Sequence, residues 1–171
     1  TLSEGTRSVL AKIEEPITLR LYYSDKLGKE IPSYGVYATR VREMLREYEN
    51  AANGKVRVEF IDPQPFSNEE DRAVAFGLQG VPVNQAGELV YFGLAGTNTA
   101  DKEEVIAFIQ PERERFLEYD LTKLVYNLAI TKKPPFVRIG SCGVLRDDIG
   151  LGELVISTGA VRLEATTKYF V

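Results

Sequence analysis

Acidic side chains form the pattern in this chain that comes closest to a recognisable chemical site. Glu69-Glu70-Asp71 places three carboxylates in a row, and such a cluster could bind a cation. The same residues follow Ser67, a good helix N-cap, so an acidic first helical turn is the simpler explanation. Glu114 and Glu118 lie four residues apart, where they could pair as acid and base on one helix face or simply face water.

The other groups that usually carry chemistry are scarce. The 171 residues include no histidine, which removes the commonest general base and the commonest metal ligand. The single cysteine, Cys142, cannot form an internal disulfide, a CxxC redox pair or a multi-cysteine zinc site. Cys142 could be reactive, but with no histidine and no evident cation near it except Arg138 or Arg146, we expect a buried structural residue. We expect no metal or other cofactor.

Charge and hydropathy argue against nucleic-acid binding and against a membrane span. The formal net charge is −4, which weighs against nucleic acid because nucleic acid is bound mainly by clustered Lys and Arg. The only basic doublet, Lys132-Lys133, precedes two prolines and is typical of a linker. No run of about 18 apolar residues occurs, so the sequence predicts no membrane-spanning segment.

Helices and strands are expected to alternate along the first half of the chain. Residues 17–23 and 56–61 are predicted strands, and residues 24–35 are predicted to be a loop because Gly28, Pro32 and Gly35 interrupt them. Three helices are predicted: a short one capped by Ser3, an amphipathic one around residues 41–48, and one from Ser67 to about Phe76.

The second half is predicted to hold two antiparallel strands and a last helix. The strands cover residues 88–94 and 104–109 with a turn at 96–102, and the helix begins at Pro111. The order helix-β-α-β-α-β-β-α, with a parallel first β-α-β unit, indicates an α/β protein with a thioredoxin-like mixed sheet. Such folds commonly hold a cis proline before the third strand. We therefore expect a cis bond at Pro82, with a trans proline that starts a strand as the alternative.

Two pairs of aromatic neighbours could line a groove. They are Tyr22-Tyr23 and Tyr91-Phe92. Because consecutive residues of a strand point to opposite faces, core packing should take at least half of them.

Six stretches are more specific than this periodicity requires. They are residues 2–6 (LSEGT), 58–63 (VEFIDP), 70–73 (EDRA), 76–82 (FGLQGVP), 90–94 (VYFGL) and 116–124 (FLEYDLTKL). Together they make residues 1–133 resemble the auxiliary components of ABC-type transport systems, including the gliding-motility auxiliary protein. The resemblance implies a parent protein anchored by a transmembrane helix just before residue 2, with this domain on the extracytoplasmic (periplasmic) face of the inner membrane. It also implies a permease and associated membrane subunits as partners, a cytoplasmic ATPase, and no catalytic residues.

A second, shorter resemblance follows the linker. Residues 136–143 (FVRIGSCG), 148–156 (DIGLGELVI) and 157–162 (STGAVR) make residues 136–171 similar to an internal piece of the nucleoside phosphorylase family. This resemblance implies that Arg138 and Ser141 bind phosphate, because guanidinium and hydroxyl groups suit its oxygens. The nucleoside pocket of that family lies outside the fragment. Two strands, from Phe136 and Leu154, are expected to form a C-terminal pair.

The sequence therefore leaves more than one function open. The first hypothesis is a non-enzymatic binding or scaffold domain, residues 1–133, followed by a linker and phosphorylase-like fragment, residues 134–171. The alternative is a phosphate-binding enzyme like the nucleoside phosphorylases, in which Arg138 and Ser141 would contribute to the site. A third possibility is a fusion of two segments that has no single function.

Overall fold

Residues 2–130 are described by a computed structural model of the chain. The predicted domain boundary at residue 133, Cys142, the phosphate ligands Arg138 and Ser141, and the expected C-terminal strand pair all lie outside the described residues.

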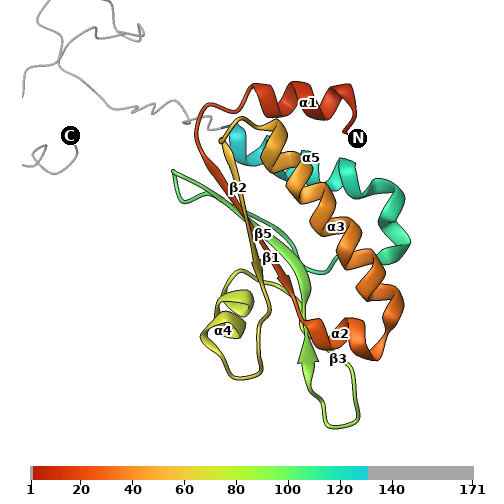
Figure 1. Ribbon diagram of the computed structural model, residues 1–171. Coiled ribbons are helices and arrows are strands. Elements are labelled where there is room, and N and C mark those ends of the chain that lie inside the picture. Colours follow the sequence, from red (N-terminus) through yellow and green to blue (C-terminus); the bar gives the residue numbers. More distant parts are fainter. Residues whose placement is uncertain (1, 131–171) are drawn as a thin grey trace, which may run out of the picture. The chain divides into compact units, whose positions relative to one another are not determined.

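A four-stranded mixed sheet forms the centre of the described part (Figure 1). Its strands stand in the order β2 (Val56–Ile61), β1 (Ile17–Tyr23), β5 (Phe92–Asn98) and β6 (Glu103–Ile106). β1 and β2 are parallel, while β5 is antiparallel to both β1 and β6. A separate antiparallel pair joins β3 (Val81–Pro82) to β4 (Leu89–Val90). The predicted α/β class is thus confirmed, and the thioredoxin-like assignment stays a prediction.

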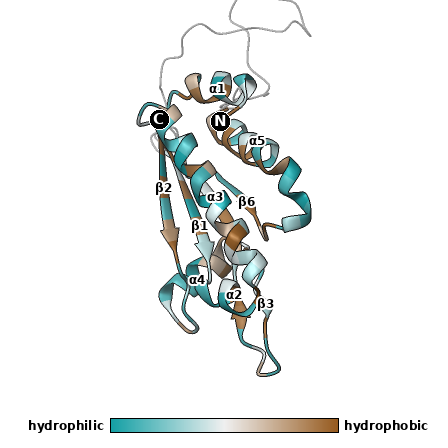
Figure 2. Cartoon of the chain, turned by 45° about the vertical axis from the view of Figure 1, so that its right-hand side comes forward, coloured by the Kyte–Doolittle hydropathy of each residue, from teal (hydrophilic) through white to brown (hydrophobic). Residues whose placement is uncertain are grey.

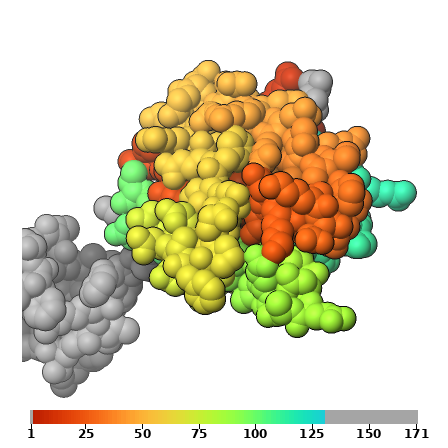
Figure 3. Space-filling model, turned by 60° about the horizontal axis from the view of Figure 1, so that its bottom comes forward, coloured from red at the N-terminus to blue at the C-terminus, as the bar shows by residue number. Residues whose placement is uncertain are grey.

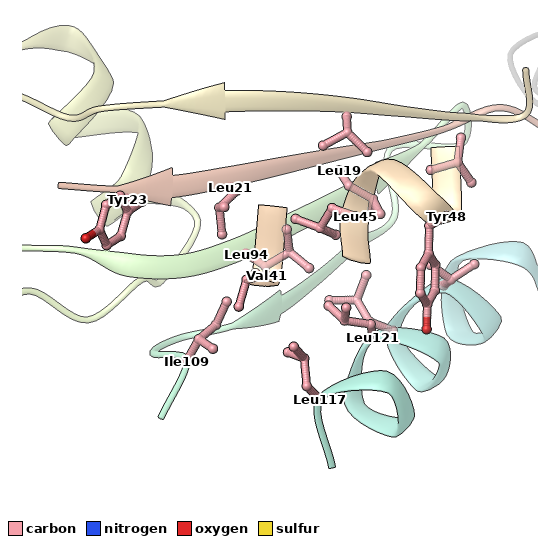
Figure 4. Close-up of a cluster of buried hydrophobic side chains, with 14 of the residues drawn as sticks. Leu19, Leu21, Tyr23, Val41, Leu45, Tyr48, Leu94, Ile109, Leu117 and Leu121 are labelled. Atoms are coloured by element: carbon pink, nitrogen blue, oxygen red, sulfur yellow. The ribbon is translucent and has the colours of Figure 1, made fainter. Parts of the chain in front are cut away.

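Three helices cover one face of the sheet. They are α1 (Glu4–Ala11), α3 (Pro32–Ala51) and α5 (Leu117–Ala129), and hydrophilic and hydrophobic residues alternate around α3 and α5 in Figure 2. Figure 4 shows the apolar side chains of α3 and α5 meeting those of β1, with Leu21, Leu45 and Leu121 all fully buried. Burial of this kind is the main stabilising contribution to such a layer.

The opposite face of the sheet carries a smaller core under α4 (Asn68–Ala75). Tyr22, between the inward-facing Leu21 and Tyr23 of β1, joins Ala73, Leu78, Tyr91 and Ala95 in this second cluster. Successive strand residues point to opposite faces, which explains why neighbouring tyrosines belong to different cores.

The interval between β1 and β2 differs most from expectation. The predicted loop 24–35 is wrong, because it contains α2 (Asp25–Glu30) and the first turn of α3, with Pro32 at the start of the helix. The glycines assumed to break structure here permit close packing instead. A Cβ atom on Gly28 would lie only 3.0 Å from the Cα atom of Gly35.

Later boundaries also shift. The expected strand 88–94 divides into β4 and β5 at Tyr91, whose backbone N–H donates to Ser24 Oγ at 2.9 Å. The turn after β5 begins only after Asn98, and the first residues of the predicted last helix, Pro111–Phe116, form the 3-10 helix η1.

The expected cis bond at Pro82 is wrong, since no cis peptide occurs among the described residues. Val81 and Pro82 pair with Val90 and Leu89 as strand β3, and Pro82 begins no helix or bend that would need the rarer isomer. The trans form is intrinsically favoured even before proline, so the alternative, a trans proline in a strand, is the one observed.

Candidate functional site

The first and last of the stretches that carry the transporter resemblance meet in space. Ser3 caps α1, and its backbone N–H donates to Glu118 Oε1 at 2.7 Å. The hydroxyl of Thr6 donates to the same oxygen at 2.6 Å and lies 3.0 Å from Thr122 Oγ1. Tyr48 of α3 completes the group, with its hydroxyl 2.6 Å from Thr122 Oγ1. These contacts tie α1 to α3 and α5, so we assign them a structural role.

Burial controls the acidity of this network. It raises the pKa of Tyr48 to about 12, despite hydrogen bonds from neighbouring threonine side chains that act in the opposite direction. The hydrogen bond from Thr6 lowers the pKa of Glu118 below its usual value. Both groups therefore keep their ordinary charge at neutral pH, as structural hydrogen-bonding partners do.

A hollow lies at the end of the sheet where the parallel strands β1 and β2 have their carboxyl ends. We call it the edge hollow. Its volume is about 370 Å³ and its lining comes from α2 with Ser24, from residues 62–65, and from residues 88–90. Figure 3 shows these three segments, red-orange, yellow and green, meeting on one face of the molecule. In open α/β sheets, ligands usually bind just outside the carboxyl ends of the strands.

One ion pair joins two charged residues of the edge hollow, and a third lining residue is paired with an arginine outside it. Lys26 forms an ion pair with Glu88, which also accepts a hydrogen bond from Asn84 Nδ2 at 3.2 Å. Asp25 pairs with Arg42 at 3.4 Å. The hydrogen bond from Lys26 lowers the pKa of Glu88 below its usual value, which makes this carboxylate a weaker base.

An aromatic side chain projects from the loop that borders the edge hollow. Phe66 follows the lining residue Pro65, is 100% exposed and has a φ angle of 62°. A positive φ is uncommon for a bulky residue, and such strain persists only where the surroundings hold it. Here the backbone N–H of Phe66 donates to Glu70 Oε2 at 2.6 Å, and Ser67 Oγ accepts from the backbone N–H of Glu70 at 3.2 Å. The loop is therefore held in a form that displays Phe66 to solvent.

Sequence reasoning missed Phe66, although a signal was present. A hydrophobic residue just before a helix N-cap normally packs against an apolar residue on the first turn of that helix. The corresponding position after Ser67 holds Asp71, so Phe66 has no apolar partner there. Leu89, which lines the edge hollow, is 40% exposed and adds to the apolar surface.

The acidic residues singled out from the sequence do not form one site. Glu69, Glu70 and Asp71 occupy the first turn of α4, which confirms the simpler explanation for them. Glu114 forms an ion pair with Arg40 from within η1, whereas Glu118 belongs to the network around Thr6. The two glutamates therefore have separate partners.

The four aromatic neighbours proposed for a groove are all core residues. Tyr22, Tyr23, Tyr91 and Phe92 are each at most 4% exposed. Tyr23 and Phe92 stack edge to face at a centroid distance of 5.1 Å in the larger core. The expectation that core packing takes at least half of them is confirmed.

No acid–base pair near neutrality is visible in the described part. A general acid or base works best when its pKa lies near the working pH. Every clear pKa shift among residues 2–130 moves the group further from neutral pH. Burial raises the pKa of the affected tyrosines, whereas hydrogen bonds lower the pKa of the affected glutamates; they are Tyr22, Tyr23, Tyr37, Tyr48, Tyr91, Glu49, Glu88 and Glu118.

Two further features are absent from the same residues. No set of three or more His, Cys, Asp or Glu side chains within residues 2–130 is placed to hold a metal ion. None of the helices in this range combines the length and the apolar character needed to cross a membrane.

Comparison with known proteins places the chain in a family. Residues 1–97 match the family model described as a domain of unknown function, DUF7088. The chain belongs to the DUF7088 family. Its matched region includes the edge hollow and Phe66, and ends within β5. No solved structure matches this DUF7088 protein.

A partial similarity to an enzyme also exists. Over 47 residues the DUF7088 protein is 40% identical to a uridine phosphorylase of Thermococcus kodakarensis. The match covers 28% of this chain and 17% of the length of that phosphorylase. It is thus a fragment-sized likeness.

Proposed function

We propose that residues 1–133 are a non-enzymatic binding or scaffold domain of an auxiliary subunit in an ABC-type transport system, of the gliding-motility kind. The domain would act on the extracytoplasmic face of the inner membrane and would contact the permease and its associated membrane subunits. The six stretches quoted above support this proposal through their resemblance to that family.

The display of Phe66 is the observation that carries the proposal. A fully exposed aromatic ring on a loop held by hydrogen bonds costs free energy in water, and apolar anchors of this kind are typical of protein interfaces. Lys26, Glu88 and Asp25 of the edge hollow are already held in ion pairs, so they suit the polar rim of an interface better than a reaction. Phe66 and Leu89 would then be the apolar contacts to the permease.

The proposal is tested by co-expressing the full-length parent protein with the permease and ATPase of its transport system, followed by purification through a tag on the permease. We expect the double variant Phe66→Ser/Leu89→Ser to reduce recovery of the auxiliary protein by about tenfold or more, since each apolar anchor in an interface contributes roughly 1 kcal/mol or more.

Tyr126→Ser is the matched control. Tyr126 is 51% exposed on α5, away from the residues that line the edge hollow, and should leave recovery unchanged. Equal recovery of all variants would contradict the assignment of Phe66 and Leu89 to the interface. Absence of any complex with the permease would contradict the proposed function itself.

A second candidate function rests on the partial likeness to uridine phosphorylase. Under this alternative, Arg138 and Ser141 would bind phosphate in a phosphorolytic reaction on a nucleoside. The test is phosphate-dependent release of uracil from uridine by the full chain. Turnover that Arg138→Ala abolishes would support the alternative, and its absence would leave the binding domain as the better account.

A further inference from the structure

A second hollow lies on the sheet face that carries α4. We call it the face hollow. Its volume is about 440 Å³, and it is lined by residues from β1, α4, β5 and the turn into β6. The lining residues are Arg20, Tyr22, Arg72, Ala75, Phe76, Thr97, Asn98, Asp101 and Glu103. None of these belongs to the edge hollow.

Two guanidinium groups supply positive charge to the face hollow. Arg20 is partly committed, because its Nε donates to Glu59 Oε2 at 3.1 Å and its Nη1 donates to Thr97 Oγ1 at 3.0 Å. The side chain of Arg72, on the exposed side of α4, has no hydrogen bond or ion pair to any other described residue. A guanidinium group offers several N–H donors in one plane and suits a carboxylate well. Arg72 is therefore the free cationic donor of this hollow.

Tyr22 gives the face hollow a buried polar atom without a partner. The side chain is 0% exposed, and its hydroxyl oxygen makes no hydrogen bond within the described structure. Buried polar groups are nearly always hydrogen-bonded, so an orphaned hydroxyl at the wall of a hollow indicates a missing partner. Burial raises the pKa of Tyr22 while the positive charges of Arg20 and Arg72 oppose that rise, so the hydroxyl stays protonated and able to donate.

Negative charge is concentrated elsewhere on the lining. Asp101 and Glu103 are exposed and flank the turn between β5 and β6. Asn98 braces this turn, since its Oδ1 accepts from the backbone N–H groups of Ala100 and Lys102 at 2.9 and 3.0 Å. The carboxylates of Asp101 and Glu103 take no part in any ion pair of the described residues. Their charge would repel a purely anionic ligand and attract an ammonium group.

We propose that the face hollow binds a small zwitterion, with its carboxylate held by Arg72 and the hydroxyl of Tyr22 and its ammonium group held by Asp101 and Glu103. The two charge patches come from different elements of the fold and are complementary to one molecule that carries both charges. This binding site is separate from the interface proposed above and does not depend on it.

The test is a titration of the full chain, labelled with ¹⁵N, with ligands that separate the two charges by known lengths. Glycine, 4-aminobutanoate and 6-aminohexanoate are the zwitterions, while hexanoate and hexylamine each carry one of the two charges. We expect one of the zwitterions to bind about tenfold more tightly than either singly charged compound, with amide shifts at β1, α4 and the β5–β6 turn.

Three variants test which side chains bind the carboxylate and which bind the ammonium group of the ligand. Arg72→Gln should weaken the best zwitterion and hexanoate by about tenfold and leave hexylamine unchanged. Glu103→Gln should weaken the zwitterion and hexylamine and leave hexanoate unchanged. Tyr22→Phe should weaken the zwitterion several-fold without lowering the melting temperature, because its hydroxyl has no protein partner to lose.

Arg7→Gln is the control, since Arg7 is an exposed α1 residue outside the face hollow. It should leave every affinity unchanged. The proposal is overturned if all probes bind equally weakly, if inorganic phosphate binds more tightly than every zwitterion, or if Arg72→Gln and Arg7→Gln behave alike. Shifts confined to the edge hollow would also overturn it.

Discussion

Replacement of Gly93 by alanine offers the most direct test of how β5 packs. Gly93 lies in β5, opposite Tyr22 of β1, within one of the stretches that carry the transporter resemblance. A Cβ atom at this position would lie 2.7 Å from Leu78 Cδ2, 2.9 Å from the carbonyl oxygen of Ile106 and 3.0 Å from that of Ala107. Two of these three atoms belong to the backbone and cannot rotate away.

The cost can be worked out from these contacts. Overpacking by one methyl group typically costs about 1–3 kcal/mol. The carbonyl of Ala107 accepts the backbone N–H of Gln79 at 3.0 Å, so a shift that relieves the clash would also weaken this bond, at roughly 1 kcal/mol. The lower conformational entropy of unfolded alanine returns about 0.4–1 kcal/mol. We expect Gly93→Ala to lower the free energy of unfolding by roughly 2 kcal/mol.

Urea unfolding followed by circular dichroism measures this change. Gly5→Ala is the matched control, because Gly5 is exposed on α1 and its added Cβ would have only Ser3 Oγ nearby, at 4.0 Å. That substitution should raise stability by about 0.5 kcal/mol, since alanine is the better helix former. If Gly93→Ala is neutral or stabilising while Gly5→Ala behaves as expected, the close approach of β5 to residues 106–107 is refuted.

Three further outcomes are expected. The hydrogen bond from Thr6 lowers the pKa of Glu118 below 4.5, so this carboxylate adds stability that is complete above the unfolded pKa and is lost as pH falls through the folded pKa. On acidification below about pH 4.5, the urea midpoint of the Glu118→Gln variant should therefore fall less than that of the unmodified chain. Parallel curves of midpoint against pH would contradict this. Tyr48→Phe removes a buried hydroxyl bonded at 3.0 Å to the carbonyl of Glu118, and should cost about 1 kcal/mol in the same assay; no loss would show that the bond is not net stabilising. Glu49 Oε1 accepts the backbone N–H of Val58 on the edge strand β2 at 3.0 Å, and so covers a donor that could pair with another chain. Glu49→Ala exposes this donor and should increase self-association in sedimentation velocity. An unchanged monomer fraction would show that Glu49 does not protect the edge strand.

Local patterns were sufficient to predict several elements from the sequence. The strands at residues 17–23 and 56–61 match β1 and β2, because alternating apolar residues specify a half-buried strand without reference to distant parts of the chain. The helix N-caps Ser3 and Ser67 were likewise predicted from the sequence. The side chain of Ser3 accepts the backbone N–H of Thr6, and that of Ser67 accepts the backbone N–H of Glu70.

Other elements depended on contacts that no local pattern reveals. Residues 24–35 contain glycines that break helices in isolation, yet α2 and α3 form because Gly28 and Gly35 can approach closely in the folded chain. The division between β4 and β5 similarly depends on the bonds of Tyr91 to Ser24, residues far apart in sequence. Tertiary packing overrode local preference at both places.

The candidate sites depend on tertiary structure even more than the helices and strands do. Composition by itself determines that the chain has no histidine, one cysteine and a net charge of −4, and these properties narrow the chemistry open to it. The edge hollow and the face hollow exist only in three dimensions, since Arg20 and Arg72 come together through a β-α-β crossover and a second helix. A sequence carries residue type and local period, whereas the meeting of distant side chains is decided by how the sheet orders its strands.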